Sequence, residues 1–171
     1  MWSRRTLLLG AATALLPGCG FRPLYGRDSG ADSTADVSRA LAGIRVDPIA
    51  DRAGQYLRNQ LLDLMTPRGR PRRPRHALRV DLREIIQELA IARNAFATRA
   101  NLRLTATFVL TDLASGKTLV SDTDTVIGSY NILTSDYATL IEQKDARERA
   151  SRELAGLIRT RIALYFSDPG S

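Results

Sequence analysis

Residues 102–111 read LRLTATFVLT, and this stretch decides the class of fold that the chain can adopt. Leucine, alanine and phenylalanine occupy every even position, while arginine, threonine and valine occupy the odd ones. This period of two predicts a β-strand with one buried face. Such a strand is typical of a sheet that has its core on one side only.

The segments that follow predict a hairpin and then a long helix. Residues 114–117 read ASGK, and Gly116 suits a tight turn that needs positive φ. Residues 118–132 are rich in Val, Ile, Thr and Tyr and predict the return strand. Polar and apolar residues are less clearly sorted between its two faces, which suits a strand near a sheet edge or an interface. Ser135 and Asp136 open a predicted helix of about thirty residues with one apolar face. That face is expected to carry Tyr137, Ile141, Ala146, Ala150, Leu154, Leu157, Ile158, Ile162 and Tyr165, with Arg147 among the residues opposite.

The segments before the first strand predict a strand, a helix and a loop. Residues 44–49 alternate with period two. Apolar residues at helical spacing follow, with Asp51 as an N-cap and Pro67 as a stop. Residues 66–76 hold three prolines and five arginines and can form neither a helix nor a central strand. Residues 78–83 then alternate as a half-buried strand.

This order, β-α-β-β-β-α, predicts an α+β fold. Four strands in one mostly antiparallel sheet, with both helices on one face, make a two-layer sandwich that buries each apolar surface. The first strand-helix-strand passage resembles a crossover, so the first pair of strands is expected to be parallel. The domain is expected to span residues 43–167, with residues 168–171 as a tail.

The first nineteen residues predict export and lipidation. Two arginines, a short apolar run and a small-residue end are the parts of a secretory signal, assigned to residues 1–18. Both an ordinary Sec signal and a looser twin-arginine signal fit this pattern. Cys19, the only cysteine, follows Leu-Pro-Gly as in a bacterial lipobox and is the expected lipidation site. Residues 19–42 are then a lipidated tether, and the missing aspartate after Cys19 favours the outer membrane.

The net charge of +7 is concentrated, because residues 45–110 hold thirteen arginines and six acids. Such a cluster is common in nucleic-acid-binding proteins. In an exported chain, phosphorylated lipid A, an anionic lipid surface or an acidic protein face is the better partner, and we expect no nucleic acid. A solvated loop without a ligand is the simpler alternative for residues 68–75.

Recognisable catalytic chemistry is missing from the sequence. No phosphate-binding, zinc-protease or nucleophile-elbow motif occurs. His76 is the only histidine and is expected to be an exposed loop residue. Asp122 and Asp124 share a strand face, where solvent-exposed acids are common. We therefore expect no enzyme, no metal site and no cofactor.

Several segments together resemble the LptE lipopolysaccharide-assembly lipoprotein family. The resemblance is carried, in order, by CGFRPLY at 19–25, LRNQL at 57–61, the strand at 102–110, SYN at 129–131, and the pairs at 137–138 and 145–146. It implies a non-enzymatic protein that plugs and helps assemble the outer-membrane β-barrel LptD and assists lipopolysaccharide delivery. It also implies a lipopolysaccharide contact at Arg93, between the second and third strands.

One alternative remains open at this level. A lipid-anchored auxiliary subunit of a periplasmic phospholipid transporter would also carry an anchor and a small α+β domain. The expected location of the chain is the cell outer membrane, on its periplasmic side, held by the lipid anchor.

Overall fold

The computed structural model describes residues 30–89 and 98–168, and the elements from Asp32 onward belong to one unit. In chain order the elements are α2 (Gly30–Ala42), β1 (Ile44–Val46), α3 (Asp51–Met65), β2 (His76–Leu89), β3 (Arg99–Asp112), β4 (Thr118–Asn131) and α4 (Asp136–Ser167). The expected series from the first strand to the last helix is confirmed. Within the described residues, α2 precedes this series.

The four strands form one mixed sheet in the order β1-β2-β3-β4. β1 pairs with β2 in parallel, and the other two pairs are antiparallel, as the sequence predicts. The register places Leu104 of β3 beside Glu84 of β2 and Val126 of β4. The sheet therefore has its parallel pair at one edge, and β4 is the strand at the other edge.

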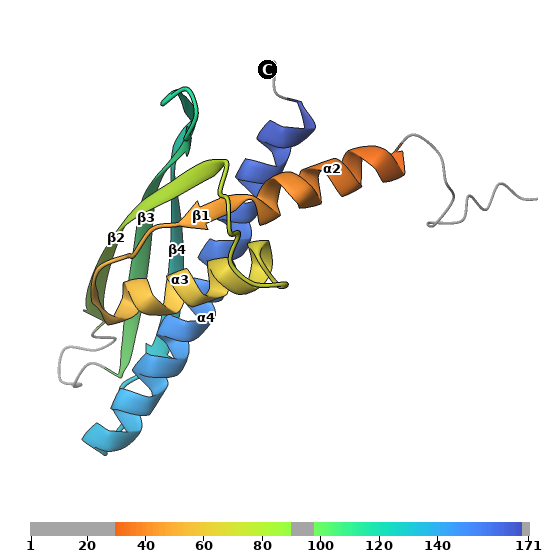
Figure 1. The fold of residues 1–171 in the computed structure, drawn as a ribbon. Helices are drawn as coiled ribbons and strands as arrows, with labels where there is room; N and C mark the ends of the chain where they lie inside the picture. The colour runs from red at the N-terminus through yellow and green to blue at the C-terminus, as the bar shows by residue number, and fades with distance from the viewer. Residues whose placement is uncertain (1–29, 90–97, 169–171) are drawn as a thin grey trace, which may run out of the picture. The chain divides into compact units, whose positions relative to one another are not determined.

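The core lies on one side of the sheet, beneath α3 and α4 (Figure 1). Along β3 the even-numbered residues from Ala100 to Leu110 are buried, as the LRLTATFVLT pattern predicts. The largest fully buried side chain is Phe108. Leucines and isoleucines of both helices complete this core: Leu57, Leu61, Leu154, Ile158 and Ile162. The two-layer α+β sandwich is confirmed.

α3 begins one residue away from the predicted cap arrangement. Its N-cap is Ala50, which has no side chain able to accept a hydrogen bond, and Asp51 is the first helical residue with a φ of 63°. Ile49 lies so close that a Cβ on Gly54 would come within 2.6 Å of it. Gly54 thus allows the tight entry into the helix. The end is as expected, because α3 stops at Met65, two residues before Pro67.

α4 begins at the predicted position and is 32 residues long. The Ser135 side chain accepts a hydrogen bond from the backbone N–H of Ala138, which caps the first turn. A Cβ on Gly128 of β4 would lie 3.3 Å from the Ala146 carbonyl oxygen, so the helix crosses β4 at close range. The predicted apolar face is only partly buried, because Tyr137 near the start of α4 is 75% exposed.

The segment expected to be a tether contains regular structure near the domain. Residues 30–42, its second half, form α2, and Leu41 at the end of this helix is buried in the core. The sequence of α2 is rich in alanine and short polar residues, so it lacks the broad apolar stripe that marks α3. Residues 19–29 lie outside the described part of the chain.

Candidate functional site

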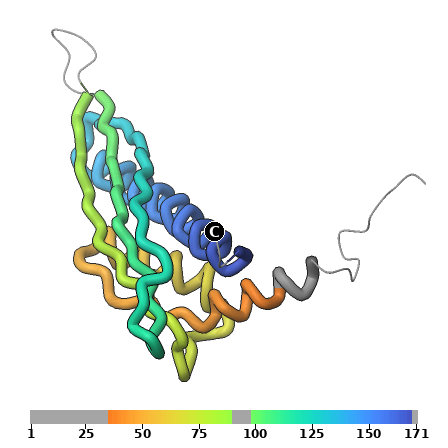
Figure 2. Tube along the Cα trace, turned by 90° about the horizontal axis from the view of Figure 1, so that it is seen from above, coloured from red at the N-terminus to blue at the C-terminus, as the bar shows by residue number. Residues whose placement is uncertain are grey.

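The three long strands expose one broad face, which we call the outer sheet face. α3 and α4 contact the opposite face, which holds the core. Figures 1 and 2 show both helices on that same side of the strands. The outer sheet face consists of Arg79, Asp81, Arg83, Ile85, Gln87 and Leu89 of β2, Arg99, Asn101, Arg103, Thr105, Thr107 and Val109 of β3, and Ser121, Thr123, Thr125, Ile127, Ser129 and Asn131 of β4.

Cross-strand hydrogen bonds order the polar groups of this face. The pairs are Thr105 with Thr125 at 3.0 Å, Thr107 with Thr123 at 3.1 Å, and Ser129 donating to Asn101 at 2.8 Å. The face carries four arginines and one acid, Asp81. It is therefore a broad, hydroxylated and net cationic surface, suited to a large polar partner rather than to a small ligand.

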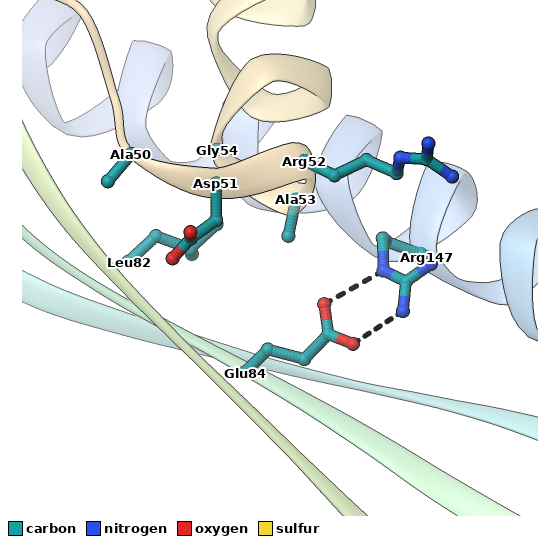
Figure 3. Close-up of a pocket in the computed structure, with 8 residues that line it drawn as sticks. All are labelled: Ala50, Asp51, Arg52, Ala53, Gly54, Leu82, Glu84 and Arg147. Atoms are coloured by element: carbon teal, nitrogen blue, oxygen red, sulfur yellow. Dashed lines mark hydrogen bonds and ion pairs between the residues drawn. The ribbon is translucent and has the colours of Figure 1, made fainter.

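A hollow of about 380 Å³ lies on the other side of the sheet, between the start of α3, β2 and α4 (Figure 3). The Arg147 guanidinium donates two hydrogen bonds to the Glu84 carboxylate, at 2.8 and 2.6 Å. These bonds raise the pKa of Arg147 above its usual value. Both charged groups are satisfied by each other, and the other charged side chains that line the hollow, Asp51 and Arg52, are exposed. The pair fastens α4 to β2.

This arrangement corrects the sequence interpretation of Arg147, which was expected on the solvent face of α4. Its side chain is 16% exposed and its partner Glu84 is 21% exposed. A long amphipathic side chain next to an apolar stripe reaches inward when a buried carboxylate is present.

A second ion cluster joins the C-terminal half of α4 to β4. The Arg161 guanidinium lies 2.7 Å from an Asp122 carboxylate oxygen and donates to Asp124 at 3.0 Å. The hydrogen bond to Asp124 raises the pKa of Arg161. Asp122 and Asp124 therefore share a face as predicted, but it is the helix-covered face, and Asp124 is buried. They bind a structural arginine.

His76 is also placed differently from the prediction. Its imidazole packs against Phe166 of α4, with ring centroids 5.2 Å apart, and its side chain is 13% exposed. Burial lowers the pKa of His76 below its usual value. Asp112 lies 3.8 Å away, and hydrogen bonds from Ser115 lower the pKa of that carboxyl. His76 is the first residue of β2, and its side chain lies against α4 instead of facing solvent.

Cys19 and Arg93, the site residues expected from the sequence, lie outside the described residues. β2 ends at Leu89 and β3 begins at Arg99. In sequence, Arg93 therefore falls between the second and third strands, as the resemblance implies. Within residues 30–89 and 98–168, no group of three or more His, Cys, Asp or Glu side chains could hold a metal ion. No helix of those ranges is long and apolar enough to cross a bilayer.

Solved structures similar to this chain share its fold. A putative lipoprotein from Caulobacter crescentus superposes with a TM-score of 0.65 at 26% identity, covering 78% of this chain and 98% of that one. A minor lipoprotein from Acinetobacter baumannii gives 0.57 at 23% identity, covering 71% and 90%. The rare lipoprotein B of Shewanella oneidensis gives 0.57 at 12% identity, covering 75% and 98%, which shows the fold alone.

The sequence comparisons extend this likeness to a family. An uncharacterised protein of Rickettsia prowazekii is 24% identical over 160 residues, which are 94% of this chain and 96% of that protein. The family model named LptE, with the description lipopolysaccharide-assembly, matches residues 41–162. That match runs from the buried end of α2 to the last fully buried isoleucine of α4, so it covers the whole core. The chain belongs to the LptE family.

Proposed function

We propose that this protein is a lipid-anchored outer-membrane component of lipopolysaccharide assembly, and that it plugs the LptD β-barrel, helps it to assemble and assists lipopolysaccharide delivery to the outer leaflet. The family match supports the assembly role. It favours this role over an auxiliary subunit of a phospholipid transporter. The similar solved structures are of lipoproteins, which supports the anchor at Cys19.

The outer sheet face is the observation that carries the plug proposal. It is long, no described helix covers it, and its hydrogen-bonded threonines present hydroxyl groups at fixed positions. A barrel interior is polar and lined by alternate strand residues. A hydroxylated sheet surface can match such a wall through many small polar contacts. The edge strand β4 contributes Ser121, Thr123 and Thr125 to that contact.

Copurification tests the plug proposal. The full-length chain is coexpressed with LptD of the same bacterium, extracted in mild detergent and isolated through a tag on this chain. We expect LptD to copurify in a constant ratio. Failure of LptD to copurify with the parent chain contradicts the plug proposal.

Two bulky variants test which surface meets the barrel. Thr125→Trp places an indole in the middle of the outer sheet face, and Arg152→Trp places one on the exposed side of α4. We expect Thr125→Trp to lose most of the copurified LptD and Arg152→Trp to keep it. Equal retention by both variants, with the parent still bound, refutes the outer sheet face as the contact while leaving the plug proposal intact.

The lipopolysaccharide contact and the anchor need separate tests. Arg93→Glu is expected to lower lipopolysaccharide affinity, because a charge-assisted hydrogen bond to a lipid A phosphate becomes a repulsion. Arg103→Glu, an exposed change of equal charge on the sheet, is the control. An equal affinity of the parent and Arg93→Glu removes Arg93 from the contact. For the anchor, labelling with a radioactive fatty acid should mark the parent and spare Cys19→Ala.

A further inference from the structure

The segment between α3 and β2, residues 66–75, carries a concentrated charge that the proposed function does not use; we call it the arginine loop. Its arginines are exposed, and none of them has an ion pair or side-chain hydrogen bond among the described residues: Arg68, Arg70, Arg72, Arg73 and Arg75. The loop holds no acid. Asp63, one turn earlier on α3, is the nearest acid before it in sequence. The loop therefore keeps most of its positive charge available.

The backbone of the arginine loop is held at both ends. The N–H of Thr66 donates to Leu62, and the N–H of Gly69 donates to Thr66, which closes the end of α3. At the other end, the N–H of Arg75 donates to the Gly43 carbonyl at 3.0 Å. Three prolines restrict the segment between these points. The arginines thus lie on a restrained loop. Little further conformational entropy of the backbone is lost when the loop binds a partner.

The arginine loop lies where the N-terminal arm joins the domain. Gly43, which accepts the hydrogen bond from Arg75, is the residue directly after α2. The carbonyl of Arg75 in turn accepts from the N–H of Leu113 in the turn between β3 and β4. Figure 2 shows this turn and the loop at one end of the strands, opposite the far end of β2. The end of α2 therefore joins the rest of the domain beside the arginine loop.

Further cations and exposed apolar side chains surround the loop. A hollow of about 350 Å³ beside it is lined by Arg68, Arg159, Pro67 and Leu64, and Leu64 is 39% exposed. Leu113, bonded to Arg75 through the backbone, is 42% exposed. Asp36 and Asp47 on adjoining segments are already paired, with Arg39 and Arg45. Arginines with leucines between them are typical of surfaces that rest on lipid headgroups.

We propose that the arginine loop binds the phosphate groups of an anionic phospholipid surface and so holds this end of the domain against a bilayer. Guanidinium groups bind phosphate oxygens bidentately, and several of them near a charged bilayer act together. A lipid surface fits better than a folded acidic protein, because the arginines spread along a proline-rich loop instead of lining one shaped pocket. The inference needs neither the barrel nor lipopolysaccharide.

Vesicle binding tests the proposal without the anchor. The buried core runs from Leu41 to Ile162, so a chain that starts at Gly20 keeps all of it and lacks Cys19. Its partition is measured on vesicles of phosphatidylcholine alone and on vesicles with about one third phosphatidylglycerol, at about 100 mM salt, where charges act over about 10 Å. Circular dichroism and a thermal melt confirm that each variant is folded.

Two variants with the same net charge show whether binding depends on the position of the arginines or only on the net charge of the chain. The loop variant changes four arginines to serine: Arg68, Arg70, Arg72 and Arg73. The control makes the same change at four exposed arginines of the outer sheet face: Arg79, Arg83, Arg99 and Arg103. An arginine near an anionic surface contributes about fivefold to partitioning, so the loop variant should lose about a hundredfold or more on anionic vesicles. The control should lose less than about tenfold, because its charges lie farther from the surface.

Each other outcome overturns the proposal. Equal losses in the two variants mean that binding follows net charge alone. Equal binding to neutral and anionic vesicles means that phosphate charge is not recognised. If the parent chain binds neither kind of vesicle, the arginine loop is not a lipid-binding surface.

Discussion

Replacing Arg147 with methionine would leave the Glu84 carboxylate inside the protein without a cation. Loss of one partner from a fully buried pair costs about 3–5 kcal/mol. Here the two side chains are 16% and 21% exposed, so water recovers part of the loss. We expect a decrease of about 2–3 kcal/mol in the free energy of unfolding, which lowers the melting temperature by about 5–10 °C in a domain of this size.

A double-mutant cycle isolates the interaction. Urea unfolding is followed by circular dichroism for Arg147→Met, Glu84→Leu and the double variant. The double variant should lie within about 1 kcal/mol of the parent, because no charge is left unpaired. Lys144→Met is the control, since the Lys144–Glu148 pair on the same helix is exposed and should change stability by less than about 0.5 kcal/mol. Losses for the two single variants that simply add in the double variant would refute the coupling that we infer from the geometry.

Four other predictions concern single positions in the sheet and in α4. Because burial lowers the pKa of His76, the unfolded chain takes up the proton first as the pH falls below about 6.5, so stability should decrease from there toward acid. His76 is the only histidine, so His76→Gln should flatten the melting temperature between about pH 7.5 and 5.5, and an unchanged slope would contradict this. Gly128→Leu should cost about 1–3 kcal/mol in urea unfolding, since a Cβ there already meets the Ala146 carbonyl. At Gly156, where a Cβ meets nothing within 4 Å, alanine should stabilise α4 by about 0.5–1 kcal/mol, and a loss there would show that the helix is packed more tightly than described. Phe108→Ala should cost about 3–5 kcal/mol, and a loss near zero would mean that Phe108 is not in the core.

Local patterns account for most of the fold. The alternation around Phe108 gives the buried face of β3, and Ser135 marks the start of α4, because both depend on neighbours in the sequence. The sequence predicts a tether where α2 forms, because the residues of this helix carry only a narrow apolar edge. Leu41 is buried through contacts with distant segments, which local patterns do not indicate. Tyr137 has the right spacing for burial, yet it is 75% exposed, because no described segment covers its side chain near the start of α4.

Long-range ion pairs were the main features that the sequence left hidden. Arg147 finds Glu84 across 63 positions, and no local rule links them. One signal was present: Glu84 continues the even-numbered series of Leu78, Val80 and Leu82, so the β-strand period places a carboxylate on the core side. A charged residue at an inward position predicts a buried partner. Lipidation at Cys19 and the lipopolysaccharide contact at Arg93 stay predictions.

β2, β3 and β4 have the same length, and this length can be compared with the thickness of a bilayer. Each strand has 14 residues, which span about 44 Å at the usual rise, close to the 40–45 Å of a bilayer with its headgroups. The arginine loop precedes β2, and Arg93 follows it. The length of β2 therefore matches the thickness of a bilayer. If the arginine loop rests on one headgroup layer and β2 runs along the membrane normal, the other end of β2 reaches the level of the opposite headgroup layer. Shortening the strands by two residues would move that end by about 7 Å, or by one strand repeat.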